Sequence, residues 1–263
     1  MEQNNIDFFI SHSRETKQKI AIPITQLLTD IGFNIWFDRK GISTGQYIYP
    51  QIENAILSSK YCIAIIDKSF LERTWTITEL EYFHKKEKCN ILPIFVKLDK
   101  DFVYSKIPWL NGIAFESMSN ESFDIKLHMN ILCRIINRYY FENITSTIDS
   151  EFKVLYKYNF PCRETLMSLL EIKEYYSHDF RLAIISLCNI NDIIYAIFNS
   201  ISTEYSKILY IISNFTNYLK CFCYDAETTP NYNIYISAYN AAVISIKELE
   251  ILLHNKKYVD YYK

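Results

Sequence analysis

The sequence predicts an α/β protein with a flavodoxin-like five-stranded parallel sheet and flanking helices, followed by an all-α C-terminal domain. Two observations predict this division. Five short apolar runs alternate with helix-length patterns before about residue 140, and parallel neighbours in a sheet need such crossover connections. All four glycines fall within the first 112 residues. Because glycine supplies the tight turns between strands and helices, the glycine-free remainder is expected to be helical.

Five short apolar runs are the expected strands. They lie at residues 6–10, 34–37, 61–66, 90–96 and 113–115. Patterns with helical spacing follow them, at residues 20–31, at 48–56, around Glu79 and near 123–140. Gly32 is expected to end the first of these helices, because a glycine after the last periodic residue is a common helix stop.

Polar side chains follow the first and third expected strands. Ser11, His12 and Ser13 come after the first, and Trp75 and Glu79 come after the third. Residues i and i+4 share a helix face, so this indole and this carboxylate point the same way. If the strands take the flavodoxin-like order 2-1-3-4-5, strands one and three diverge at their C-terminal ends and open a crevice there. The two clusters then lie at one place, the expected active site.

The second part of the chain carries helical patterns rich in Ile, Leu, Tyr and Phe. They lie at residues 151–158, 163–176, 180–200, 204–224 and 232–255. Several are apolar over most of their circumference, which is typical of a packed bundle or a subunit contact. We therefore expect two domains, residues 1–142 and residues 143–263, the second serving as a sensor or oligomerisation domain.

Charge and hydropathy exclude several classes of partner. The formal net charge of the 263 residues is −2, and in the first 145 residues 17 Lys and Arg meet 17 Asp and Glu. Binding to nucleic acid normally needs a basic excess, so no nucleic-acid partner is expected. No apolar run approaches the roughly 18 to 20 residues that cross a bilayer, and the first residues lack the features of a signal peptide. We expect no membrane association and a cytoplasmic location.

The seven cysteines predict neither disulfides nor a metal site. They are odd in number, widely scattered and mostly embedded in apolar stretches, where reduced thiols act as small hydrophobes. Only Cys221 and Cys223 are close in sequence, and no second Cys or His pair stands at the spacing of a zinc site. No metal is expected.

Five segments, in register, resemble a Toll/interleukin-1 receptor (TIR) domain of the prokaryotic NAD-cleaving type, over residues 1 to about 140. They are DFFISHS at 7–13, the strand and loop from GFNIWFD at 32–45, SSKYCIAII at 58–66, WTITEL at 75–80 and NILPIF at 90–95. The resemblance implies an NAD+ nucleosidase, a glycohydrolase or ADP-ribosyl cyclase-like enzyme. It would release nicotinamide and form ADP-ribose or a cyclic isomer, with NAD as substrate and no cofactor.

The resemblance also implies roles for individual residues. Glu79 takes the catalytic position. The positions near bound NAD are Ser11, His12, Ser13, Asp38, Lys40 and Trp75. Many relatives carry a basic residue directly after the last aromatic residue of the first of these segments. This chain has Ser13 there, with Arg14 one position later, so the resemblance does not say which residue contacts the phosphates. Prokaryotic relatives often act in antiviral defence or signal transduction, switched on by self-association. Here that would involve TIR domains and the C-terminal helices, with a sensor or effector protein as a further partner.

The chemistry suits these residues. Glycoside hydrolysis usually takes two carboxyl groups, one of them to protonate the leaving oxygen. Nicotinamide leaves NAD from a cationic state and needs no proton, so one ionised carboxylate near the ribose suffices. Trp75 supplies an aromatic wall that excludes water and can face a cation. The diphosphate is expected on backbone amides at the helix start, residues 14–16.

Each of these residues also has a purely structural interpretation. Thr76 and Glu79 fit a capping box, in which the glutamate reaches back to the amide of the N-cap residue. His12 fits a structural hydrogen-bonding role, and Asp38 fits the stabilisation of a turn. Trp36 and Trp109 are expected in core or loop packing.

Other functions fit the sequence less well than the TIR resemblance does. Asp67 after the third strand suggests a phosphoacceptor receiver domain, but the acidic pair after strand one and the lysine after strand five are missing. The glycine motifs of dehydrogenases and nucleotide triphosphatases do not occur. The remaining alternative is a non-catalytic TIR scaffold that binds other TIR domains. The pair Trp75 and Glu79 favours the enzyme.

Overall fold

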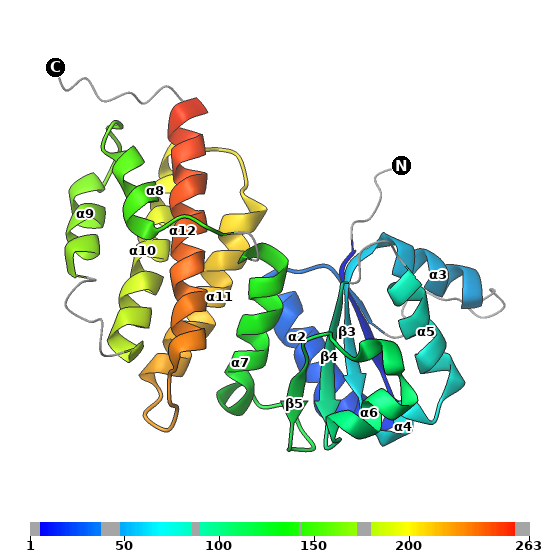
Figure 1. The fold of residues 1–263 in the computed structure, drawn as a ribbon. Coiled ribbons are helices and arrows are strands. Elements are labelled where there is room, and N and C mark those ends of the chain that lie inside the picture. The colour runs from blue at the N-terminus through cyan, green and yellow to red at the C-terminus, as the bar shows by residue number, and fades with distance from the viewer. Residues whose placement is uncertain (1–5, 38–47, 86–89, 142–143, 173–179, 256–263) are drawn as a thin grey trace. The chain divides into compact units, whose positions relative to one another are not determined.

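The computed structural model describes residues 6–37, 48–85, 90–141, 144–172 and 180–255 (Figure 1). Its contacts divide the chain into two compact units, residues 1–124 and residues 125–263. The first unit is a parallel α/β sheet domain and the second is helical, as the sequence predicts.

The sheet of the first unit has five parallel strands in the order β2-β1-β3-β4-β5, which confirms the flavodoxin-like arrangement. The strands are β1 Ile6–His12, β2 Ile35–Phe37, β3 Ser59–Ile66, β4 Ile91–Val96 and β5 Glu116–Met118. The helices are α1 Arg14–Thr16, α2 Ile22–Ile31, α3 Ile48–Ser58, α4 Lys68–Leu71, α5 Thr74–Lys85 and α6 Lys100–Lys106. A π-helical turn, η1 Lys17–Ala21, joins α1 to α2, and a 3₁₀ turn, η2 Pro108–Leu110, follows α6.

The central strands are buried on both faces. Neighbouring residues of β1, Phe8 and Phe9, are both fully buried, and so are Ile63 and Ala64 in β3. Successive side chains of a strand point to opposite faces, so each face must be covered by helices, as parallel sheets require. One of the two cores joins alternate residues of β1, β3 and β4 to apolar residues of α3, α5 and α6.

Capping residues define the ends of two helices near the site. Gly32, at φ 114°, ends α2 in the left-handed region, and its amide donates to the carbonyl oxygens of Leu28 and Thr29. The predicted helix stop is therefore confirmed, for the reason that glycine adopts this conformation without steric cost. Asp67 caps α4, since its Oδ1 accepts from the amide of Phe70 at 2.8 Å. Its carboxylate thus has a structural role.

The fifth strand was placed too early by the sequence analysis. It was expected at residues 113–115, but the strand that pairs with β4 is Glu116–Met118. Phe115 instead stacks on Phe95 at a centroid distance of 4.4 Å and, like Ile113, packs partly buried against the core. The apolar run therefore marked side-chain packing ahead of the strand, because apolar side chains can be buried without backbone pairing.

Helices make up the second unit. They are α7 Ile125–Ile136, the π-helical turn η3 Asn137–Phe141, α8 Ile148–Leu155, α9 Arg163–Ile172, α10 Phe180–Ile201, α11 Lys207–Tyr224 and α12 Tyr232–Asn255. Helices α10, α11 and α12 contact one another along the unit (Figure 1). Helix α7 contacts α12, and Nδ2 of Asn137 donates to Ser237 Oγ on α12 at 3.0 Å. These contacts group α7 with the second unit, whereas the expected domain boundary at residue 142 places it with the first.

Helix α10 corrects the expectation that no segment is long and apolar enough to cross a membrane. Within the described part of the chain, this helix alone has that length and composition, with a mean hydropathy of 1.5. Half of the apolar stretch is buried inside the protein. The core helix of a bundle has the same properties, and Ile184, Leu187 and Ile194 on α10 are each at most 1% exposed.

Candidate active site

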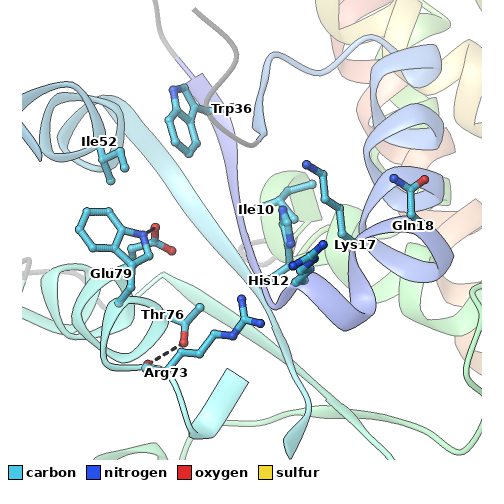
Figure 2. Close-up of a pocket in the computed structure, with 11 residues that line it drawn as sticks. Ile10, His12, Lys17, Gln18, Trp36, Ile52, Arg73, Thr76 and Glu79 are labelled. Carbon is cyan, nitrogen blue, oxygen red and sulfur yellow. Dashed lines mark hydrogen bonds between the residues drawn. The ribbon is translucent and has the colours of Figure 1, made fainter. Parts of the chain in front are cut away.

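A cleft of about 750 Å³ opens beside the C-terminal part of β1, between that strand and helix α5. Its walls come from β1, β2, α1, η1, α3 and α5, and Figure 2 shows the lining side chains. This volume lies within the range of about 300 to 1,000 Å³ that small-molecule sites occupy. The cleft is where the strand order predicts a ligand site in an open parallel sheet.

Both oxygens of the Glu79 carboxylate accept hydrogen bonds. Trp75, one helical turn earlier on α5, donates from Nε1 to Oε1. Ser11, on β1, donates from Oγ to Oε2 at 2.7 Å. Hydrogen bonds of this kind stabilise an ionised carboxylate. The side chain lines the cleft, so the carboxylate is held at the wall of a cavity.

The capping-box interpretation of Thr76 and Glu79 is wrong. Helix α5 begins at Thr74, so Thr76 is its third residue and is no N-cap. The buried Thr76 hydroxyl donates to the carbonyl oxygens of Phe70, at 2.6 Å, and Arg73, at 2.9 Å. Thr76 therefore ties the start of α5 to the end of α4, and Glu79 extends from the second turn of the helix.

Apolar and aromatic side chains line part of the cleft. Trp75, Trp36, Ile52 and Ile10 all line it. Trp36 lies flat on Phe9, with ring centroids 4.5 Å apart and planes inclined by 7°. It therefore packs on the core, as the sequence predicts, and also presents its ring to the cavity (Figure 2).

The other predicted packing residue, Trp109, stacks on His84 with centroids 4.0 Å apart. An apolar recess of about 40 Å³ extends the cleft between α3 and α5 and shares Ile52, Trp75 and Glu79 with it.

Cationic side chains line the cleft as well. Arg14, Lys17 and Arg73 all border it, and Figure 2 shows Lys17 and Arg73 there with Glu79. Arg73 pairs with Glu15, with Nη2 and Oε1 3.2 Å apart. A side-chain hydrogen bond from Ser69 is the main cause that lowers the pKa of Glu15, and the charge of Arg73 contributes.

Lys17 and Arg73 were not predicted as site residues from the sequence, although both line the cleft. The spacing of Arg14 and Lys17, three residues apart, is a usable signal, because such residues share a helix face. Arg73 stands two residues before Trp75, just ahead of the helix that carries the site, and its place in the cleft follows from the packing of that helix beside β1.

His12 lines the cleft. Its ring stacks on Phe37 with centroids 5.0 Å apart, and its Nδ1 lies 2.8 Å from the carbonyl oxygen of Ser13. A carbonyl can only accept, so Nδ1 carries the proton. In the neutral ring, Nε2 is then the acceptor.

The two serines predicted at the substrate lie behind the cleft wall. Ser11 is 1% exposed and Ser13 is fully buried, and the cleft lining includes neither. Ser13 caps α1, because its Oγ accepts from the amide of Thr16 at 3.2 Å. One of the amides expected to hold the diphosphate is therefore already occupied. Asp38 and Lys40 lie outside the described residues.

Metal ligands are not gathered in the described part of the chain, where no group of three or more His, Cys, Asp or Glu side chains has a suitable geometry. Cys133 and Cys188 are buried as free thiols. Burial raises the pKa of Cys133 to about 12 and that of Cys188 well above its usual value, so both thiols stay protonated.

Comparison with known proteins finds similarity to one family. Residues 8–127 match the family model described as TIR domain. A 2′ cyclic ADP-D-ribose synthase of Acinetobacter baumannii is 30% identical over 123 residues, which are 45% of this chain and 46% of the relative. Another, from Bacteroides thetaiotaomicron, is 35% identical over 107 residues, 40% of this chain and 37% of the relative.

An NAD(+) hydrolase of a Theionarchaea archaeon is 31% identical over 102 residues, 38% of this chain and 31% of that relative. The chain thus spans less than half the length of each of these relatives. The match to the family model lies almost wholly in the unit that contains the cleft.

Proposed function

Because residues 8–127 form a TIR domain, we propose that this chain is an NAD+ nucleosidase that cleaves the bond between nicotinamide and ribose. One observation carries the proposal. The carboxylate of Glu79 is held by donors from two different elements, Ser11 and Trp75, at the wall of a cleft with aromatic and cationic sides. Relatives of this unit are named NAD(+) hydrolases and 2′ cyclic ADP-D-ribose synthases.

The reaction needs charge stabilisation more than proton transfer. The bond between C1′ of the ribose and the nicotinamide nitrogen breaks, and its electron pair neutralises the pyridinium ring as it leaves. The ribose is left as an oxocarbenium ion. The carboxylate of Glu79 stabilises that positive charge where it develops, which lowers the barrier because the donors to its oxygens are already in place.

Two acceptors can then complete the reaction. Water adds its oxygen to C1′ and releases a proton, which yields ADP-ribose. Alternatively a hydroxyl of the same molecule adds to C1′ and releases its proton, which yields a cyclic isomer. The aromatic wall of Trp75 and Trp36 excludes bulk water from one side of the cleft and thereby influences which acceptor reaches C1′.

The cations of the cleft suit the diphosphate of NAD. Arg14 and Arg73 present guanidinium groups, which match phosphate oxygens in geometry and charge. Arg73 is paired with Glu15 in the structure, with both side chains about half exposed. An exposed pair of this kind is weak, so a diphosphate can take the place of Glu15 at little cost.

The biological setting is part of the proposal. NAD is the substrate and no cofactor takes part. We expect self-association through TIR domains and the C-terminal helices, a role in antiviral defence or signalling, a sensor or effector protein as partner, and a cytoplasmic location. The apolar character of the second unit supports a role in assembly, since its long helices have few charged positions.

The test is a nicotinamide-release assay. Purified protein is incubated with NAD, alone and under conditions that promote assembly, beside Glu79→Gln and the control Glu81→Gln, an exposed residue of the same helix. We expect release from the wild type and from the control. Glu79→Gln should lose at least about 100-fold, since it removes the charge that stabilises the transition state.

The outcomes of this assay separate the enzyme from the scaffold. Equal background release from wild type and Glu79→Gln in both conditions would favour the non-catalytic TIR scaffold. If nicotinamide is released, chromatography of the second product distinguishes ADP-ribose from a cyclic isomer. Light scattering recorded together with turnover shows whether activity needs assembly. A monomer that releases nicotinamide at the full rate would contradict the expectation that activity depends on self-association.

A further inference from the structure

Ser11 is placed to act on Glu79 and away from the ligand. It lies one residue before the end of β1, pairs in register with Ala64 of β3, and is 1% exposed. Its side chain is not part of the cleft lining. The hydroxyl donates to Oε2 of Glu79 at 2.7 Å, between residues 68 positions apart in the chain.

The two donors to Glu79 come from elements of different kinds. Trp75 is on α5 itself, so its hydrogen bond moves with the helix and fixes the carboxylate only relative to that helix. Ser11 is on β1, which lies between β2 and β3 in the sheet. Its hydrogen bond therefore fixes the carboxylate relative to a buried central strand of the sheet. The carboxylate is thus tied both to its own helix and to the sheet, and sites built on helices and strands keep their geometry better than sites on loops.

We infer that Ser11 is a positioning residue, whose hydroxyl holds the Glu79 carboxylate ionised and oriented at the cleft wall without touching the substrate. The catalytic consequence rests on the proposed function. The hydrogen bond between Ser11 and Glu79, and its effect on the titration of Glu79, are independent of the proposed function. Ser11 thereby differs from His12, its neighbour in β1, which lines the cleft directly.

Other charged and titratable side chains line the cleft and its recess together with Glu79. They are His12 on β1, Arg14 on α1, Lys17 on η1, Glu53 on α3, Arg73 ahead of α5 and Tyr82 on α5. All of them remain when Ser11 is replaced by alanine. The change between wild type and Ser11→Ala therefore reports the hydroxyl alone.

The indole signals of the protein provide a readout that needs no activity. The chain has three tryptophans, so a two-dimensional ¹H–¹⁵N NMR correlation spectrum contains three indole N–H signals. The indole signal that is absent from the spectrum of Trp75→Phe is assigned to Trp75. If the position of this signal changes with pH in the wild type but not in Glu79→Gln, the change reports the titration of Glu79. In Ser11→Ala we expect the midpoint of that response to move up by about one pH unit, because a hydrogen bond to the charged form has been removed.

Two further variants serve as controls for Ser11→Ala. Ser11→Thr retains the hydroxyl and should return the midpoint towards that of the wild type. Ser59→Ala removes another buried serine hydroxyl of the same sheet, which donates to the carbonyl of Ala55, and should leave the midpoint unchanged. Thermal unfolding confirms that each variant is folded. An unchanged midpoint in folded Ser11→Ala, or an equal shift in Ser59→Ala, overturns the inference.

Kinetics separate this inference from the proposed function. If the wild type releases nicotinamide, Ser11→Ala should lower kcat by about tenfold, leave KM nearly unchanged and move the acidic limb of the pH profile upward. An unchanged profile would reject the positioning role and leave the NAD-cleaving activity standing. If no protein releases nicotinamide, the proposed function fails, and the indole titration still decides whether Ser11 holds Glu79.

Discussion

The indole nitrogen of Trp75 donates a hydrogen bond to Oε1 of Glu79 across one turn of helix α5. The same ring lines the cleft, so one side chain both orients the carboxylate and forms the aromatic wall next to it. The spacing of four residues thus has a direct geometric meaning here, because it places the two side chains on one helix face.

Replacing Trp75 by phenylalanine separates these two roles. Trp75→Phe keeps an aromatic wall and loses the donor. We expect nicotinamide release to fall about tenfold, since one hydrogen bond to a charged group contributes about 1.5 kcal/mol. Steady-state kinetics at fixed pH provide the measurement. Trp109→Phe, which alters a ring stacked on His84 outside the cleft lining, is the matched control. Equal losses in both variants would point to a general loss of stability.

The pair of Arg73 and Glu15 predicts opposite effects on substrate affinity. Arg73→Gln removes a cation from the cleft and should raise KM for NAD about tenfold, with a small change in kcat. Glu15→Gln removes the carboxylate that competes for Arg73 and should lower KM a few-fold. Both effects should shrink at high salt, because exposed charges are screened. The control is Lys106→Gln, an exposed residue of α6. If neither substitution changes the KM for NAD, Arg73 does not bind the diphosphate.

Glu248 in α12 predicts a pH-dependent stability. Burial raises the pKa of this carboxyl, and a hydrogen bond from Ser206 opposes that effect in part. Between the unfolded pKa and the raised folded pKa, the native state holds a proton that the unfolded state has lost. Stability therefore falls as the pH rises through this window.

Glu248→Gln removes the buried charge. We expect it to stabilise the protein at neutral pH by less than about 1.4 kcal/mol, the value of one pH unit, and to have little effect below pH 4. Urea unfolding at pH 4 and pH 7.5 measures the difference, with Glu227→Gln, which is 83% exposed, as the control. A destabilised variant at pH 7.5 would show that the Ser206 contact outweighs burial.

The position of the domain boundary can be tested by truncation. A fragment of residues 1–142 retains α7 but loses α12, against which α7 packs. Met129, Leu132 and Ile136 of α7 are each at most 2% exposed in the full chain. We expect the fragment to bind a hydrophobic dye and to aggregate with increasing concentration, as light scattering would detect. A monodisperse fragment that unfolds cooperatively would instead support a boundary at residue 142.

Local patterns in the chain determine much of the fold. The bounds expected for the last two long helices, 204–224 and 232–255, agree with α11 and α12 to within three residues, because apolar spacing reflects which face of a helix is buried. Gly32 marks the end of α2 for an equally local reason, its left-handed backbone. The fifth strand was misplaced because Ile113 and Phe115 pack without pairing, and a short apolar run does not distinguish the two.

The active site depends on relations that no local pattern contains. The pair Trp75 and Glu79 was recognisable, since both residues lie on one helix turn. The donor role of Ser11, the burial of Ser13 and the cleft position of Arg73 follow from strand order and from the packing of α5 beside β1. Residues close in sequence are related by backbone geometry, which is nearly constant for a given element. Residues 68 positions apart meet only where the packed core brings their elements together, so their contact belongs to the folded molecule as a whole.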